Sequence, residues 1–265
     1  MYSFNYQKVK SVADAAALLA NDADARPLAG GQSLVAAMKL RLSKPSNVLD
    51  LGSIADLRGI KVEGNAVVIG AMTKHAEVAS SAEVKKGIPA LASLAAGIGD
   101  RMVRNMGTMG GSVANNDPAA DYPAGVVALN ATIITNKRKI EADKFFKGMY
   151  ETALEQGELI TAISFPVPKR AAYMKFKNPA SRYAIVGVFV ADFGNAVRVA
   201  VTGAAAGVFR VADMEKALGA KFAPESVASI TVPDTDLNSD MHAKADYRAH
   251  LITVMAKRAV SSALT

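Results

Sequence analysis

The chain has 265 residues and a mass of 27.6 kDa, which leaves room for two modest domains. Its composition, 51% hydrophobic and 21% charged, is that of a globular protein with a large core and excludes a disordered chain. The 31 basic and 24 acidic side chains give a net charge of +7. The basic side chains are scattered, and their densest run is only residues 137–139, so they indicate a solubilising surface and not a nucleic-acid track.

Cysteine is absent, which excludes disulfides, iron–sulfur clusters bound by this chain and thiol catalysis. The three histidines, His75, His242 and His250, lie too far apart in sequence to indicate a metal site. Redox chemistry would therefore need an organic cofactor. The longest uncharged run, residues 122–136, is too short for a membrane span, and no secretory signal is recognisable, so we expect a cytoplasmic protein.

Helices and strands alternate irregularly along the chain. Ser11 followed by Asp14 is a capping-box pattern, and the apolar spacing after it predicts a helix. A second helix is expected from Ser33, and Asp117-Pro118 predicts a helix start with Asp117 as its N-cap. Further helices are expected at 73–82, 89–98, 211–218 and 242–262, and strands at 47–51, 66–72, 131–135, 139–142, 158–165, 184–191 and 196–204.

The absence of regular βαβ repetition indicates the α+β class for both halves. Two prolines, Pro166 and Pro168, followed by Lys169 and Arg170, interrupt the pattern of elements. We therefore expect two domains, at residues 1–170 and 171–265.

Two glycine-rich segments are candidates for binding a diphosphate. Gly30 and Gly31 precede the second helix, where backbone amides without side chains in the way can approach a phosphate. Gly110 and Gly111 lie in a similar segment, rich in hydroxyl and amide side chains. A single Gly-Gly pair is commonly only a turn, but two such loops can bind one diphosphate from opposite sides. A Rossmann fingerprint is absent.

Asp121 follows the second segment and is a candidate acceptor for a sugar hydroxyl of the same dinucleotide. The alternative is that its carboxylate only favours the positive end of a helix.

The segments 29–34 (AGGQSL) and 108–123 (TMGGSVANNDPAADYP) resemble the FAD-binding medium subunit of molybdenum hydroxylases, in the xanthine dehydrogenase and aerobic carbon monoxide dehydrogenase branch. Residues 69–73 (IGAMT), 157–160 (GELI) and 246–251 (DYRAHL) support the resemblance, which runs collinearly over nearly the whole chain. It implies an FAD-binding domain of two α+β subdomains, of the PCMH (vanillyl-alcohol-oxidase-like) type. A smaller α+β carboxyl-terminal domain with a short antiparallel sheet and helices follows.

The resemblance also implies roles for individual residues, none of them catalytic and none a metal ligand. The first loop and the second loop would hold the FAD diphosphate, Asp121 the ribityl or ribose region, and Lys177 the neighbourhood of the isoalloxazine. The expected cofactor-binding residues are Leu28, Ala29, Gly30, Gly31, Gln32, Ser33, Thr108, Gly110, Gly111, Ser112, Asn115, Asp121, Leu159, Ile160 and Lys177. Neither loop contains a histidine, so non-covalent FAD is expected. The alternative for Lys177 is a solvated cation at a strand end.

The implied function is to take single electrons from the [2Fe–2S] clusters of a small partner subunit and pass them to an external acceptor. A large partner subunit would hold the molybdenum cofactor, in a heterotrimer or its dimer, with no nucleic acid involved. Two alternatives remain open. One is a stand-alone FAD-dependent oxidoreductase with its own substrate pocket. The other is a flavin-free scaffold that binds nucleotide or RNA.

Overall fold

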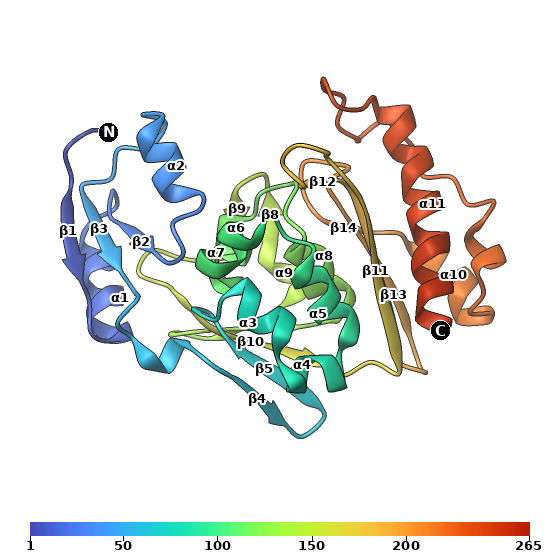
Figure 1. Cartoon of the computed structure of the whole chain (residues 1–265), viewed down its shortest axis with the longest axis horizontal. Coiled ribbons are helices and arrows are strands. Elements are labelled where there is room, and N and C mark those ends of the chain that lie inside the picture. Colours follow the sequence, from blue (N-terminus) through green and yellow to red (C-terminus); the bar gives the residue numbers. More distant parts are fainter.

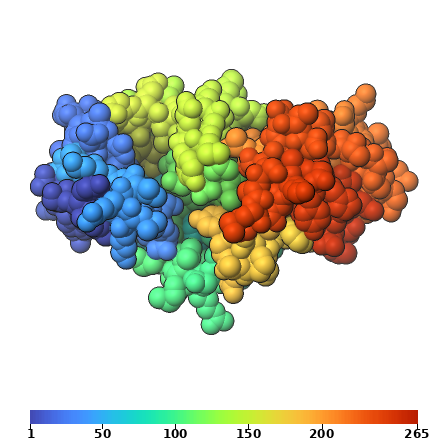
Figure 2. Space-filling model, turned by 90° about the horizontal axis from the view of Figure 1, so that it is seen from above, coloured from blue at the N-terminus to red at the C-terminus, as the bar shows by residue number.

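The computed structural model describes all residues, 1–265, and its chain forms three packed parts along the long axis of the molecule (Figure 1). The amino-terminal and carboxyl-terminal parts lie at opposite ends in the space-filling view (Figure 2). Each part has its own buried apolar cluster, of 10, 31 and 19 residues in chain order. No helix is both long enough and apolar enough to span a bilayer.

The amino-terminal part is a small parallel sheet with two helices. It comprises β1 (Asn5–Lys8), α1 (Val12–Asn21), β2 (Arg26–Leu28), α2 (Leu34–Lys39) and β3 (Asn47–Asp50), with strand order β1-β3-β2 and both pairs parallel. Ser11 caps α1 by accepting the Asp14 N–H at 3.0 Å, as the sequence predicts. This part does contain βαβ crossovers, which the sequence analysis missed because strands of three or four residues are too short to show a period.

The central part is a five-stranded antiparallel sheet covered by short helices. The strand order is β4 (Ile60–Glu63), β5 (Ala66–Gly70), β10 (Ile160–Pro166), β6 (Thr132–Thr135) and β7 (Lys139–Glu141). The helices are α3 (His75–Ser80), α4 (Ala82–Gly87), α5 (Pro89–Ala96), α6 (Arg101–Met106), α7 (Met109–Asn115), α8 (Tyr122–Ala128) and α9 (Ala142–Phe145). A 3-10 turn at Ala55–Leu57 and the pair β8 (Phe146–Gly148) and β9 (Glu151–Thr152) complete it.

The helix start predicted at Asp117-Pro118 is wrong. Helix α8 begins at Tyr122 with Asp121 in the N-cap position, whereas the Asp117 side chain accepts the Ala119 N–H at 2.9 Å in a local turn. The Pro118 carbonyl accepts the Gly203 N–H at 2.9 Å, so this segment is held by the carboxyl-terminal sheet. That tertiary contact overrides the local capping pattern.

The carboxyl-terminal part is an antiparallel sheet, in order β11 (Arg170–Lys177), β12 (Ala184–Asp192), β13 (Val197–Thr202) and β14 (Phe209–Arg210). Helices α10 (Ala212–Ala220) and α11 (Ala245–Leu264) cover one face, with a 3-10 turn at Pro224–Val227. All nine residues of β12 are buried, because Phe189 packs into the central core and Val188 into the core under α11. The α+β class predicted from the sequence is confirmed, and so are the two long strands expected around residue 194.

Arg248 connects the layers of the carboxyl-terminal part. Its side chain on α11 is only 3% exposed and donates to the carbonyls of Ile185 at 2.7 Å and Gly203 at 2.9 Å. It also donates to the Asp240 carboxylate at 2.8 Å. The Arg248 guanidinium therefore supplies hydrogen bonds from α11 to two buried carbonyls of the sheet layer.

We expect Arg248→Met to lower the free energy of unfolding by about 3 kcal/mol, because it leaves those carbonyls without a partner. Urea unfolding followed by circular dichroism measures the change. Lys257→Met, at an exposed position of the same helix, is the control and should stay within about 0.5 kcal/mol of wild type. Equal stability of the two variants would contradict the role given to Arg248.

Candidate cofactor site at the glycine loops

The first glycine loop connects β2 to α2 and lies directly against the second loop. A Cβ atom on Gly30 would lie 2.3 Å from the Met106 carbonyl oxygen and 2.6 Å from the Gly107 Cα, so no side chain fits there. Gly31 has a φ of +71°, in the left-handed region that favours glycine. These two requirements explain the Gly-Gly pair. Because Gly30 has no side chain, its backbone can touch a segment more than seventy residues further along the chain.

Backbone N–H groups of the first loop have no acceptor within the chain. None of the amides of residues 29–34 donates a hydrogen bond to a backbone or side-chain oxygen, and Ser33 makes no capping bond to α2. Gln32 and Ser33 are exposed, so these amides are open to solvent or to a ligand. A row of unpaired amides at the start of a helix is a favourable place for an anion such as a diphosphate.

The second loop forms the start of α7 and differs from the first because its amides are already used. Met109 N donates to Thr73 O at 3.0 Å, Gly110 N to Ala71 O at 2.8 Å, and Gly111 N to the Thr108 hydroxyl at 3.2 Å. The Thr108 amide is free of intrachain partners.

Gly110 is required in the second loop because a Cβ there would lie 2.5 Å from the Ala71 Cβ. A Cβ on Gly111 would lie 3.4 Å from the Ala29 Cβ, so the second loop faces the first. The structure therefore assigns most of the free donors to the first loop and a close-fitting wall to the second.

Leu159 and Ile160 lie beside this pair of loops. Leu159 is buried in the amino-terminal core, against which Ala29 also packs, and its N–H donates to the Asn136 side chain at 2.8 Å. Ile160 begins β10, and the next residue accepts the Ala71 N–H at 2.9 Å. Ala71 thus connects the start of β10 to Gly110 of the second loop.

Asp121 lies deeper than the sequence suggests. Its carboxylate is 5% exposed, accepts a short hydrogen bond from the Tyr173 hydroxyl and pairs with the Lys175 ammonium at 3.0 Å. Burial raises the pKa of Asp121, against the opposing effect of Lys175 and Tyr173. In the same network, burial raises the pKa of Tyr173 well above its usual value. Asp121 makes no capping bond to α8, so the sequence alternative of a simple helix-end charge does not describe these contacts.

Lys175 is the lysine of β11 that reaches the central part, and sequence reasoning missed it. Its ammonium also donates to the carbonyls of Gly97 at 2.9 Å and Arg182 at 3.0 Å. Lys177, the lysine singled out from the sequence, ends β11 after an irregularity in the ladder and is exposed. The alternation of Tyr173, Lys175 and Lys177 at every second residue could have indicated that Lys175 lies on the same face of the strand as the other two.

Asn115 and Ser112 lie on α7, half-buried, between the second loop and the segment that contains Asp121. Asn116, the next residue, ends the helix in the left-handed conformation and donates to the carbonyls of Gly148 at 2.7 Å and Glu151 at 2.8 Å. The far end of α7 is therefore fixed to the β8–β9 pair, and Ser112 and Asn115 keep their polar groups free.

His75 packs against Gly107, just before the second loop, and its ring contacts that of Tyr122. Sequence reasoning missed this pair too. Their rings are 5.3 Å apart, and neither His75 Nδ1 nor the Tyr122 hydroxyl has a hydrogen-bond partner. A Cβ on Gly107 would lie 2.5 Å from His75 Nε2. Burial, aided by the nearby Arg104, lowers the pKa of His75 to about 4, so the ring is neutral at pH 7.

Two hollows lie away from the loops. One, of about 370 Å³, lies between the central and carboxyl-terminal parts, and its lining includes Asp117, Tyr150 and Tyr183. Burial raises the pKa of both tyrosines, with Asp117 adding to the effect.

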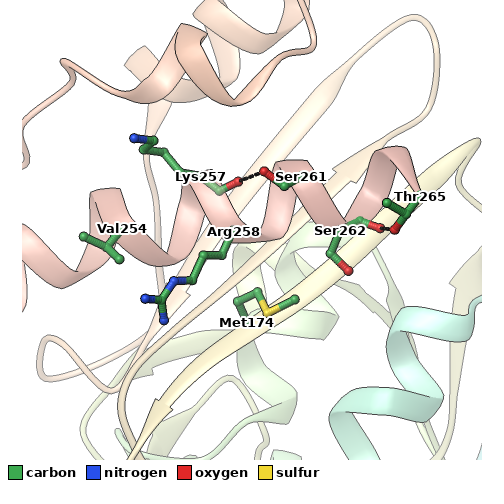
Figure 3. A pocket seen from close by; sticks show the side chains of 7 residues that line it. All are labelled: Met174, Val254, Lys257, Arg258, Ser261, Ser262 and Thr265. Carbon is green, nitrogen blue, oxygen red and sulfur yellow. Dashed lines mark hydrogen bonds between the residues drawn. The ribbon is translucent and has the colours of Figure 1, made fainter.

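The other hollow, of about 640 Å³, is an open groove along α11. Figure 3 shows its Ser261 and Thr265 hydroxyls turned back onto the helix carbonyls of Lys257 and Ser262, so they are not free to bind a ligand.

The residues at the loop contact fit a dinucleotide such as FAD. Free amides are available for a diphosphate at the first loop, and hydroxyl and amide groups follow along α7. Of the residues expected from the sequence, those of both loops, Leu159 and Ile160 lie together, whereas Asp121 is engaged by Tyr173 and Lys175.

Comparison with known proteins agrees with this geometry. Two family models match the chain, "FAD binding domain in molybdopterin dehydrogenase" over residues 2–168 and "CO dehydrogenase flavoprotein C-terminal domain" over residues 171–263. The carbon monoxide dehydrogenase medium chain of Hydrogenophaga pseudoflava is 37% identical, over 98% of this chain and 96% of the relative. The nicotine 6-hydroxylase medium subunit of Paenarthrobacter nicotinovorans is 34% identical, over 98% and 97%.

Solved structures show the same likeness. Carbon monoxide dehydrogenase from Hydrogenophaga pseudoflava matches with a TM-score of 0.90 and 36% identity, covering 99% of this chain and 98% of the other. Quinoline 2-oxidoreductase from Pseudomonas putida 86 matches with a TM-score of 0.89 and 28% identity, covering 99% and 97%. The resemblance found in the sequence is confirmed over the whole chain.

Because the pKa of His75 is low in the folded state, we expect this residue to make the free energy of unfolding depend on pH. Because the unfolded state binds a proton below about pH 6.5 and the folded state only near pH 4, this side chain costs stability as the pH falls through that window. We expect wild type to lose about 2 kcal/mol more than His75→Phe between pH 7 and pH 4.5. Urea unfolding of both proteins at the two pH values measures the difference, in which the carboxylates common to both cancel. Identical pH profiles would show that His75 is not held neutral.

Proposed function

The chain belongs to the family of FAD-binding medium subunits of molybdenum hydroxylases, and on that basis we propose that it binds FAD non-covalently and relays electrons. The electrons come singly from the [2Fe–2S] clusters of a small partner subunit and leave to an external acceptor. The family contains a FAD-binding domain, and the relatives are named dehydrogenases, so the chain is a component of an oxidoreductase. A flavin supplies the exchange between one-electron and two-electron carriers.

One observation carries this proposal: a row of amides without acceptors, residues 29–34, lies where the first glycine loop touches the segment before the second. We assign the diphosphate of FAD to this loop, from Leu28 to Ser33, with Thr108, Gly110 and Gly111 on the other side. Fixed amides need no reorganisation to receive a charged group, so they bind and orient it at once.

The remaining assignments follow the direction of α7 away from the loops. We place the sugar and ribityl hydroxyls near Ser112, Asn115 and Asp121, and the flavin ring between the Leu159–Ile160 backbone and Lys177. In this arrangement Leu159 and Ile160 exclude water from one edge of the ring. Lys177 offers a positive charge, which favours an electron-rich ring. Lys175 acts through Asp121, because it neutralises a carboxylate that would otherwise oppose that effect.

Relatives named medium chain or subunit act within multi-subunit complexes. We propose the same for this chain: a small [2Fe–2S] subunit, a large subunit holding the molybdenum cofactor, a heterotrimer or its dimer, and a cytoplasmic location. We also keep the division into an FAD-binding domain at 1–170 and a carboxyl-terminal domain at 171–265. β11, the first strand of the carboxyl-terminal sheet, begins at Arg170, within one residue of that boundary.

A stand-alone oxidoreductase remains the second candidate, because the hollow lined by Asp117, Tyr150 and Tyr183 offers polar groups for a small substrate. Purification of the chain from its native host separates the two. Equimolar FAD with molybdenum, iron and two further subunits supports the relay. A pure flavoprotein that turns over a substrate alone supports the second candidate.

Gly30→Ala tests the contact between the two glycine loops. Gly30→Ala adds a Cβ where the Met106 carbonyl already lies, so we expect FAD affinity to fall at least tenfold. Flavin fluorescence titration of the apoprotein measures the dissociation constant. The control is Gly219→Ala, since nothing lies within 4 Å of a Cβ at Gly219, and its affinity should match wild type. Equal affinities for both variants would argue against the diphosphate assignment.

Acid denaturation tests whether the flavin is held without a covalent bond. No histidine lies in either loop, so denaturation with acid should release all of the flavin into the supernatant. Absorbance of the supernatant and the pellet measures it. Yellow colour that stays with the precipitated protein would contradict non-covalent binding.

A further inference from the structure

Glu158 is a buried carboxylate that directly precedes Leu159 and Ile160. Its side chain is 0% exposed, and it accepts the Thr135 hydroxyl at 2.7 Å and a backbone N–H, that of residue 155, at 2.9 Å. Arg138 binds both carboxylate oxygens, through Nε and Nη2, each at 3.0 Å. Burial raises the pKa of Glu158, but the hydrogen bonds from Arg138 and Thr135 outweigh it, so the pKa is lowered and the group is ionised at pH 7.

Residues 155–159, the linking segment, contact the amino-terminal part on one side. Gly157 has a φ of +69°, and a Cβ there would lie 2.9 Å from the Ala20 Cβ of α1. The Gln156 side-chain amide donates to the carbonyl of Asp22, at the end of the same helix, at 3.3 Å. Helix α1 leads through β2 into the first glycine loop. The linking segment is therefore packed on the helix that precedes that loop.

The turn that follows β6 contacts the linking segment from the other side. The Asn136 N–H donates to the Leu159 carbonyl at 3.1 Å, and its side chain accepts the Leu159 N–H at 2.8 Å. The same side chain donates to the Gly157 carbonyl at 3.2 Å, and the Lys137 ammonium donates to the Gln156 carbonyl at 2.9 Å. Because β6 belongs to the five-stranded sheet, the linking segment lies between α1 and the central part.

We propose that Glu158 is a positioning residue for the cofactor: it fixes the linking segment between α1 and the central sheet, and thereby places the Leu159–Ile160 backbone beside the flavin. A carboxylate bound by the planar fork of Arg138 has a defined orientation as well as a defined place. The proposal rests on the proposed function, because that function puts the flavin ring at Leu159 and Ile160.

A role in stability alone explains these bonds less well. A buried charge loses its water, so an ion pair with a buried member commonly stabilises a fold no better than apolar side chains of similar size. Leu159 and Ile160 are themselves buried, and apolar packing is enough to keep them in the core. The bonds to Glu158 add direction to the main chain, which matters where backbone groups must meet a cofactor.

Glu158→Gln keeps the size of the side chain but removes its charge and one acceptor oxygen. We expect the full chain with this substitution to fold, as judged by circular dichroism, and to bind FAD about tenfold more weakly, because its binding backbone is less well fixed. The midpoint potential of the bound FAD should shift as well, since the backbone beside the ring moves. Fluorescence titration of the apoprotein measures the affinity, and spectroelectrochemical titration measures the potential.

Glu155→Gln is the matched control. The Glu155 carboxylate pairs with the same Arg138 guanidinium at 3.0 Å, but its side chain is 57% exposed. This variant should match wild type in both FAD affinity and midpoint potential. A loss as large as that of Glu158→Gln would show that any change of charge at Arg138 has this effect, and would overturn the role given to Glu158.

Arg138→Met separates positioning from stability. It leaves Glu158 buried without its counter-charge, so the free energy of unfolding and the FAD affinity should both fall. Adding Glu158→Gln removes the unpaired charge, so the double variant should regain stability in urea unfolding while its FAD affinity stays about tenfold below wild type. The proposal is overturned if affinity recovers together with stability. It is also overturned if Glu158→Gln binds FAD within about twofold of wild type at an unchanged potential.

Failure of the proposed function gives a different result. In that case the wild-type chain itself takes up no FAD, and the positioning role falls with it. Failure of the positioning proposal alone leaves the wild-type chain loaded with FAD, while Glu158→Gln equals it in affinity and potential.

Discussion

The contact between the Gly30 backbone and the Met106–Gly107 backbone is the constraint on which the rest of the site depends. A Cβ at Gly30 would lie only 2.3 Å from the Met106 oxygen, so these segments touch main chain to main chain. The contact continues into the sheet, because Gly110 donates to Ala71 and Ala71 donates to the residue after Ile160. Close-packed backbones deform little, so the amino-terminal part is held at a fixed distance from the central part.

The backbone amides of the second loop are hydrogen-bonded within the chain and those of the first loop are not, and this difference follows from where each loop lies. The second loop is buried between β5 and α6, where an unpaired N–H would be costly, and its amides accordingly bond to Ala71 and Thr73. The first loop borders solvent, where Gln32 and Ser33 are exposed and water can satisfy their amides. An anion that replaces this water gains bonds to several fixed donors without breaking any bond in the protein.

Local patterns in the sequence predicted what local physics decides. The Ser11 cap, the long strands β12 and β13 and both glycine loops follow from capping, alternation and the backbone freedom of glycine. The helix start at Asp117 failed because its neighbour Pro118 bonds to Gly203, eighty-five residues on, which no local pattern records. The unpaired rings of His75 and Tyr122 were hidden for the same reason, since each is ordinary in its own helix. The expected cofactor-binding residues came from the family resemblance, because helix and strand propensities do not indicate which residues bind a cofactor.

Lys175 shows how the carboxyl-terminal sheet is oriented on the site. Burying Asp121 would be costly without a partner, and Lys175 supplies one from β11 while also bonding Gly97 on one side and Arg182 on the other. An apolar contact such as that of Phe189 tolerates small shifts of the sheet, whereas three directed bonds from one ammonium do not. The strand end at Lys177 is therefore placed by an ion pair two residues away. The carboxyl-terminal part, which contributes nothing to either glycine loop, thereby acquires a defined position beside them.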